Sequence, residues 1–478
     1  MRLSEIFAKD IQRPIEGVIK ADDATHLGTE VEEYVLTGEA AKGLELLLEE
    51  YTSYTNANGV WISGFFGSGK SHMLKMLAHL LGDVEGQSFP RQRVSDSFRS
   101  KSSGAFLPGL LDKAARIPAK SLLFNIDQKA TLISKDQTDA LLKVFVKVFD
   151  ESCGYYGNHG HVARFERDLD SRGQYAAFKE AFQRIAGIPW SQGREQSKLE
   201  AASIDRAFAE VNGKAASDII GQYSRDYAVS IEDFANQVRA WLGQQGDPAF
   251  RLNFFVDEVG QFIGQDTKLM LNLQTIAESL NTRCGGRAWV FVTSQEDMEK
   301  VIGDQTRQQG NDFSKIQARF KTRVKLSSAD VEEVIRKRLL EKNPPAATEL
   351  GAIYAAQHAS FKTLFNFIDG AKTYRNYIDE AHFVGTYPFV TYQFPLFQAA
   401  IVGISDHNIF EGRNSSVGER SMLGVVQQVA KEIQDLEIGE LATFDRMFAG
   451  IRASLKSAAQ NAISVAERNL DNELAVSS

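Results

Sequence analysis

Short apolar runs separated by stretches of helical periodicity dominate the pattern of this chain. The runs are rich in Val, Ile, Phe and Trp, and they cover residues 58–63, 119–126, 251–257, 287–293 and 322–326. Runs that are apolar at almost every position are typical of strands buried on both faces. Because helical patterns lie between them, the sequence predicts an α/β fold whose parallel sheet has right-handed crossovers.

Helical patterns fill most of the remaining chain. The first helix is expected over residues 39–56, whereas residues 83–104 are polar and Ser-rich and predict a loop. Residues 130–247 show helical periodicity without a strand-like run and are too long for an ordinary crossover, so they predict a helical insertion between the second and third strands. Residues 346–440 are expected to be all-helical, and residues 442–470 form an Ala- and Ser-rich helical pattern.

Composition and charge narrow the class of protein. The chain has 478 residues with 43% hydrophobic and 24% charged residues, which is ordinary for a soluble protein of two or three domains. No apolar run reaches membrane-spanning length, the N-terminus lacks the apolar core of a signal peptide, and the two cysteines imply no disulfide framework. We therefore expect a cytoplasmic protein without a membrane partner.

The net charge of −8 gives no overall basic footprint for nucleic acid. One local run is basic, with no acid among Lys315, Arg319, Lys321, Arg323 and Lys325. This run could form a surface that faces phosphate groups, or it could be a solvated face beside a strand. Direct DNA binding is therefore kept as a hypothesis.

Residues Gly64 to Ser71 read G-F-F-G-S-G-K-S, the pattern of a phosphate-binding P-loop. An apolar run precedes it and a helical pattern follows, which is the strand–loop–helix context that the motif needs. Backbone N–H groups and the helix N-terminus would bind phosphate, with Lys70 on the β- and γ-phosphates and Ser71 on Mg²⁺. The expected nucleotide-binding residues are Gly64, Phe65, Phe66, Gly67, Ser68, Gly69, Lys70, Ser71 and His72. The alternative is a glycine-rich turn that binds nothing.

Two acids end the third apolar run, which reads L-N-F-F-V-D-E. Such a run predicts a buried strand that delivers carboxylates to the C-terminal edge of a parallel sheet, where ligands bind. Asp257 is expected to support Mg²⁺, and Glu258 to polarise an attacking water as general base. The alternative is a solvated acidic turn.

Other candidate residues carry weaker signals. Thr293 and Ser294 end the fourth run, where they could hydrogen-bond the attacking water or the γ-phosphate, or cap the following helix. Cys153, His159 and His161 cluster in sequence, but their spacing matches no common zinc pattern and favours an aromatic-rich loop. Residues 15–20 could lie near the nucleotide base.

The order of these motifs resembles the AAA+ class of ATPases, and K-I-Q-A-R-F-K-T-R-V-K-L and G-E-R-S-M-L-G-V-V-Q resemble its initiator and origin-recognition branch. The resemblance implies a five-stranded sheet of order 5-1-4-3-2 and a C-terminal helical lid. It also implies that Arg319 is an arginine finger for a neighbouring subunit, with Arg323 as a rival. Arg420 is the implied sensor of the lid, with Arg413 as a rival. Each arginine could instead form an ordinary surface ion pair.

By this reading the chain divides into an N-terminal segment (1–38), an ATPase core (39–330) with the insertion at 130–247, and a helical lid (331–440). A C-terminal helix (441–478) would lead into a missing remainder.

Longer motifs are similar to the N-terminal ATPase region of the P-loop proteins of BREX phage-defence systems, the BrxC (PglY) family. They are I-F-A-K-D-I-Q-R-P-I-E-G-V-I-K-A-D, G-V-W-I-S-G-F-F-G-S-G-K-S-H, Y-P-F-V-T-Y-Q-F-P-L-F-Q and S-S-V-G-E-R-S-M-L-G-V. This resemblance implies a bacterial ATPase that uses ATP and Mg²⁺ and forms a nucleotide-dependent homo-oligomer. The implied partners are a methyltransferase, an alkaline-phosphatase-like protein and DNA. A nucleotide-gated scaffold or DNA clamp with little turnover, and a P-loop kinase, are the rival hypotheses.

Overall fold

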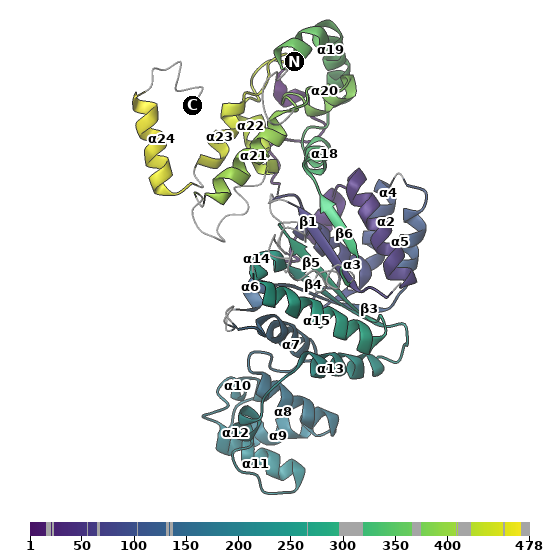
Figure 1. The fold of residues 1–478 in the computed structure, drawn as a ribbon, viewed down its shortest axis with the longest axis vertical. Coiled ribbons are helices and arrows are strands. Elements are labelled where there is room, and N and C mark those ends of the chain that lie inside the picture. Colours follow the sequence, from purple (N-terminus) through teal and green to yellow (C-terminus); the bar gives the residue numbers. More distant parts are fainter. Residues whose placement is uncertain are drawn as a thin grey trace, which may run out of the picture.

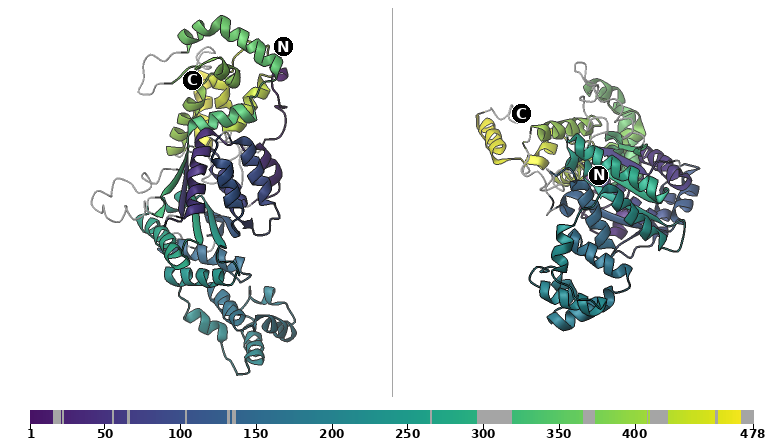
Figure 2. Two further views of the ribbon diagram at one scale, coloured as in Figure 1. Left: turned by 90° about the vertical axis from the view of Figure 1, so that its right-hand side faces the viewer. Right: turned by 60° about the horizontal axis from the view of Figure 1, so that its bottom comes forward.

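The computed structural model describes residues 1–15, 21, 23–54, 56–64, 67–102, 104–130, 133, 137–264, 266–295, 319–365, 374–407, 409, 422–452 and 455–469. Its strands are β1 (Gly59–Gly64), β2 (Asp83–Val84), β3 (Ala119–Asn125), β4 (Arg251–Asp257), β5 (Ala288–Ser294) and β6 (Thr322–Leu326). The described part of the chain is elongated, with a sheet between two groups of helices (Figures 1 and 2).

The strands form one parallel sheet in the order β2-β3-β4-β5-β1-β6. The five predicted runs are all strands, and their order is the expected one. The expectation of five strands is nevertheless wrong, because the two-residue strand β2 pairs with Lys120 and Ser121 of β3 and adds a sixth. A strand of two residues leaves no alternating or continuous apolar pattern that a sequence could reveal.

The predicted loop over residues 83–104 is also wrong, because it contains helix α4 (Arg91–Lys101). Only Val94 and Phe98 carry large apolar side chains into the core there, and Ser95 is buried beside them. The remaining positions of α4 are polar, so the apolar stripe is too narrow to stand out in the sequence. Tertiary packing therefore decides the structure of this segment.

Helices cover both faces of the sheet (Figure 1). One layer contains α1 (Leu27–Glu33), α2 (Gly38–Ser53), α3 (Lys70–Leu81), α4 and α5 (Leu107–Ala115), and its core includes Leu47, Leu74 and Leu77. The other layer contains α6 (Ile126–Lys129), α7 (Ala140–Ser152), α13 (Ile231–Gly243), α14 (Val259–Ile263) and α15 (Thr267–Cys284). Both layers bury apolar side chains against the strands, which explains why the strands are apolar at nearly every position.

The described part of the predicted insertion contains helices and no strand. Its first and last helices, α7 and α13, pack on the sheet, and the helices between them form a separate head. These are α8 (Gly160–Ser171), α9 (Tyr175–Ala186), α10 (Trp190–Gly193), α11 (Ala201–Asn212) and α12 (Ile219–Arg225). The head has its own aromatic core, in which the fully buried Glu166 accepts hydrogen bonds from Tyr175 (2.9 Å) and Trp190 (2.7 Å).

A second group of helices lies at the opposite end of the molecule from the head (Figure 1). It contains α18 (Ser328–Arg338), α19 (Pro344–Leu364), α20 (Glu380–Thr386), α21 (Gln393–Asp406), α22 (Met422–Glu432), α23 (Phe444–Arg452) and α24 (Ser457–Asn469). The N-terminal segment, including the 3-10 helix η1 (Leu3–Glu5), packs into the same core through Leu3, Ile6 and Ile11. We call this assembly the helical domain.

The predicted C-terminal helix is interrupted between α23 and α24. Within the described ranges, no helix combines the length and apolar character needed to cross a membrane.

Candidate nucleotide-binding site

The P-loop connects the end of β1 to the start of α3. Gly67 and Gly69 have φ angles of 76° and 89°, a region that favours glycine and lets successive N–H groups face one concavity. Gly64 is needed for another reason, since a Cβ there would lie 2.8 Å from the carbonyl oxygen of Leu326 and 2.5 Å from the Ser68 hydroxyl. The predicted strand–loop–helix context is therefore present. Phe65 and Phe66 lie outside the described residues.

The two acids lie beside this loop because β4 and β5 end at the same edge of the sheet. The Thr293 hydroxyl at the end of β5 donates to Asp257 (2.6 Å) and accepts from the backbone N–H of Glu258 (2.8 Å). Thr293 thus joins both acids, a role that the sequence did not suggest, and its expected contact with the attacking water or the γ-phosphate stays a prediction. Ser294 lines the same pocket and packs against Gly260, where a Cβ would collide with its hydroxyl.

Glu258 is held in an unusual way. Its φ is 64°, a left-handed conformation that costs energy in a non-glycine residue and is common at functional sites. The Asn125 amide at the end of β3 donates to the Glu258 carboxylate (2.8 Å). Burial raises the pKa of Glu258, while the hydrogen bond from Asn125 acts in the opposite direction.

Sequence reasoning missed Asn125. It lies next to the end of the second apolar run and is the last residue of β3, so the rule that drew attention to Asp257 and Thr293 also applies to it. The amide oxygen accepts from Asp127 and Gln128 at the start of α6, and this capping role gives the residue a second structural function.

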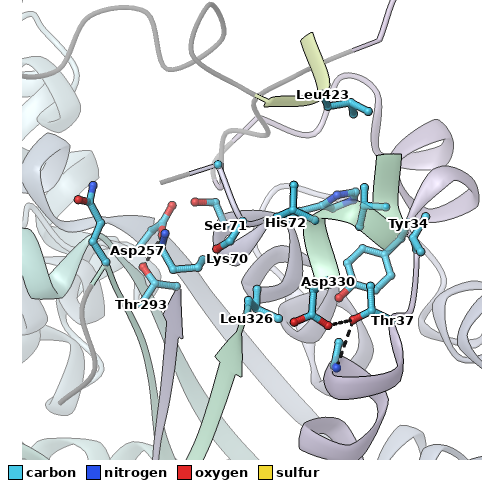
Figure 3. Close-up of a pocket in the computed structure, with 18 of the residues that line it drawn as sticks. Tyr34, Thr37, Lys70, Ser71, His72, Asp257, Thr293, Leu326, Asp330 and Leu423 are labelled. Atoms are coloured by element: carbon cyan, nitrogen blue, oxygen red, sulfur yellow. Dashed lines mark hydrogen bonds between the residues drawn. The ribbon is translucent and has the colours of Figure 1, made fainter. Parts of the chain in front are cut away.

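Lys70 lies in the pocket beside Asp257 (Figure 3), and Glu258 lines the same pocket. Burial lowers the pKa of Lys70 to about 8, and the charges of Asp257 and Glu258 act against that shift. The Ser68 hydroxyl is buried and has no hydrogen-bond partner among the described residues. A buried ammonium group, a hydroxyl without a partner and a loop whose glycines turn N–H groups into the cavity together fit a phosphate chain. Ser71 and Asp257 would offer oxygen ligands for Mg²⁺.

The opposite wall of the pocket comes from three distant segments (Figure 3). Tyr34 and Thr37 precede α2, Asp330 belongs to α18, and Leu423 comes from α22. Thr37 donates to Asp330 (2.5 Å), which ties the sheet domain to the helical domain. Sequence reasoning missed this wall.

The sequence predicts that residues 15–20 lie near the nucleotide base. Ile15 packs against the core of the helical domain, and residues 16–20 lie outside the described ranges.

His72 also lines the pocket, but its imidazole is engaged by the protein. Its Nε2 lies 3.1 Å from the carbonyl oxygen of Glu30, and Tyr34 packs edge-on against its ring. Burial, followed by the positive charge of Arg338, lowers the pKa of His72 to about 3. The imidazole is therefore neutral at physiological pH.

Arg319 is not part of this pocket. It precedes β6 at the amino ends of the strands, opposite the P-loop, where its guanidinium pairs with Glu278 of α15 (3.1 Å). Any contact with a nucleotide would therefore have to involve another subunit. Arg323 is exposed on β6, whereas Arg413, Arg420 and Lys315 lie outside the described residues.

The Cys153, His159 and His161 cluster shows aromatic packing. The two imidazole rings lie 5.6 Å apart, and Tyr156 contacts the first of them. Within the described ranges, no group of three or more His, Cys, Asp or Glu residues is arranged to hold a metal ion.

A search against models of known protein families found no match for this chain.

Proposed function

We propose that the protein binds ATP with Mg²⁺ and hydrolyses it in the manner of an AAA+-like ATPase. The observation that carries the proposal is the hydrogen-bonded group of Asp257, Thr293 and Glu258 beside the buried Lys70. A P-loop alone would suit a kinase as well. A second carboxylate next to the phosphate site favours hydrolysis, because it can accept a proton from an attacking water.

Each residue has a distinct task in this mechanism. Lys70 and the P-loop N–H groups bind and orient the phosphate chain, and Lys70 offsets its negative charge. Ser71 and Asp257 would hold Mg²⁺, which supplies further charge neutralisation when bound. Glu258 accepts the proton of the attacking water, and its raised pKa makes it a stronger base than an exposed carboxylate. Thr293 fixes the relative positions of the two acids.

The biological setting that we propose rests on the sequence resemblance. It is a bacterial BREX anti-phage system in the cytoplasm, where the nucleotide state would control the assembly of a DNA-methylating and phage-restricting complex. The methyltransferase, the alkaline-phosphatase-like protein and DNA would be the partners. A homo-oligomer is part of the proposal, since Arg319 can reach a nucleotide only in another subunit.

Nucleotide binding by Lys70→Ala tests the first step of the proposal. We expect at least a hundredfold loss of ATP affinity, measured by titration calorimetry, because the variant lacks the only lysine of the P-loop. Lys179→Ala in the distant head serves as the control and should bind ATP like the wild type. Normal ATP binding by Lys70→Ala would contradict the assignment of the P-loop.

A nucleotide-gated scaffold with slow turnover is a second candidate function. Two contacts favour it: Asn125 holds the carboxylate of Glu258, and Glu278 of the same chain holds Arg319. Light scattering of Glu258→Gln with ATP and Mg²⁺ separates the two functions. A hydrolysing ATPase should be trapped in an ATP-bound oligomer by this variant, whereas the assembly of a scaffold should not change.

A further inference from the structure

Arg338, the last residue of α18, lines the candidate nucleotide pocket on the side of the helical domain. Only 8% of its surface is exposed. One Nη group donates to the carboxylate of Glu33. The Nε–H is buried and has no acceptor among the described residues. A buried guanidinium N–H without a partner is costly, so its presence in a pocket wall points to a ligand.

Asp257, Glu258 and Asp330 also line the pocket, but at Glu33 a second guanidinium group accompanies Arg338. Arg13 lies 3.7 Å from the same carboxylate and donates to the backbone carbonyl of Arg338. Two guanidinium groups therefore share one negative charge at Glu33. This local excess of positive charge favours an anion over a neutral ligand.

Arg338 also lies near the start of α3. Its charge contributes to the low pKa of His72, next to the larger contribution of burial, and His72 follows Ser71 directly in the first turn of that helix. The same helix N-terminus is the expected site of the phosphate groups.

We propose that Arg338 binds the phosphate chain of the nucleotide from the helical domain and exchanges part of its contact with Glu33 for the phosphate. The inference rests on the proposed function, since it assumes a nucleotide in the pocket. By this inference Arg338 of α18 senses the phosphate chain of the nucleotide from the helical domain.

The exchange would couple nucleotide binding to the N-terminal segment. Glu33 and the carbonyl of Arg338 are two of the partners of the Arg13 guanidinium, and the residues before Arg13 are packed into the helical domain. A phosphate that draws Arg338 away from Glu33 leaves this carboxylate to Arg13 alone. Nucleotide binding would therefore change the contacts between residues 1–15 and the helices of the helical domain.

Arg336 provides a matched control on the same helix. It lies two residues earlier, lines a different groove, pairs with Glu332 (3.8 Å) and packs on Gly385. A substitution there removes the same charge from the same helix but does not alter the nucleotide pocket.

The test measures the dissociation constants of ATP, ADP and inorganic triphosphate for the wild type, Arg338→Met, Arg336→Met, Glu33→Gln and Lys70→Ala. We expect Arg338→Met to weaken all three ligands at least tenfold, and Arg336→Met to stay within twofold of the wild type. Glu33→Gln should tighten binding several-fold, because it releases Arg338. A purely structural Arg338 would not produce this gain.

Unchanged affinity in Arg338→Met would overturn the inference, as would a loss confined to ATP and ADP with triphosphate unaffected. If Arg338→Met fails to fold, Arg338→Met combined with Glu33→Gln removes both charges and should bind more weakly than Glu33→Gln alone. Equal affinity of these two variants would also overturn the inference. A wild type that binds no nucleotide, or a Lys70→Ala variant that binds normally, would instead contradict the proposed function.

Discussion

The two walls of the nucleotide pocket are built in different ways. The phosphate wall is local: the P-loop occupies eight consecutive positions, and its acids lie at the ends of neighbouring strands. The opposite wall joins segments separated by about three hundred residues, such as Thr37 and Asp330, through single hydrogen bonds. The first wall is fixed by backbone geometry and the second by side-chain contacts. We therefore expect changes at the first wall to have larger effects than changes at the second.

Among substitutions that leave the charged groups of the site in place, Gly64→Ala should have the largest effect on ATP binding. The added Cβ would meet the backbone of Leu326 at 2.8 Å and the Ser68 hydroxyl at 2.5 Å, and a backbone atom cannot easily move away. We expect at least a thirtyfold loss of ATP affinity and destabilisation by about 2 kcal/mol. Titration calorimetry and chemical denaturation measure the two quantities.

Gly109→Ala in α5 is the matched control, since no atom lies within 4 Å of its added Cβ. It should bind ATP normally, and its free energy of unfolding should increase by about 0.5–1 kcal/mol, because alanine is favoured over glycine in a helix. If Gly64→Ala behaves like this control, backbone geometry does not define the phosphate wall.

A smaller effect is expected at Asn125, which connects β3 to the acids. Asn125→Asp keeps the oxygen that caps α6 but loses the donor to Glu258. Glu258 becomes more basic, because it loses this hydrogen bond and gains a second carboxylate beside it, so we expect basal phosphate release to rise about three- to tenfold. A fall in the rate would show that Asn125 positions Glu258 for catalysis and does not restrain it.

The smallest effect on nucleotide binding is expected at His79, which lies in α3 behind the P-loop and contributes to stability in a pH-dependent way. Burial, aided by the charge of Lys75, lowers the pKa of His79 to about 4 from an ordinary value of about 6.5. The unfolded chain therefore binds a proton that the folded chain does not, and stability falls as pH drops from about 6.5 to 4.

The His79→Met variant should lose part of this pH dependence. Between about pH 6.5 and 4 its free energy of unfolding should fall by up to about 3 kcal/mol less than that of the wild type. Denaturant midpoints at several pH values measure it, with the exposed His358→Gln as control. Identical pH profiles for wild type and His79→Met would exclude a buried neutral imidazole at this position.

The same contrast explains what the sequence could predict. The five long strands and the placement of Lys70, Asp257 and Thr293 follow from local patterns, because parallel strands bring their carboxyl ends to one edge. Asn125 obeys the same rule, but a lone amide at a strand end does not attract attention.

The pairing of Thr37 with Asp330, and of Glu33 with Arg338, depends on how the helical domain packs against the sheet. No local pattern contains that information. Helix α4 was missed for a related reason, since its burial depends on two apolar side chains in a polar segment.

Single-turnover phosphate release with ATP and Mg²⁺, comparing the wild type with Glu258→Gln, tests the central claim most directly. Bound nucleotide is measured in the same samples. The account predicts that the variant retains ATP while phosphate release falls at least a hundredfold, because the buried carboxylate beside Asp257 and Thr293 accepts the proton from water. Equal phosphate release by wild type and Glu258→Gln would contradict it.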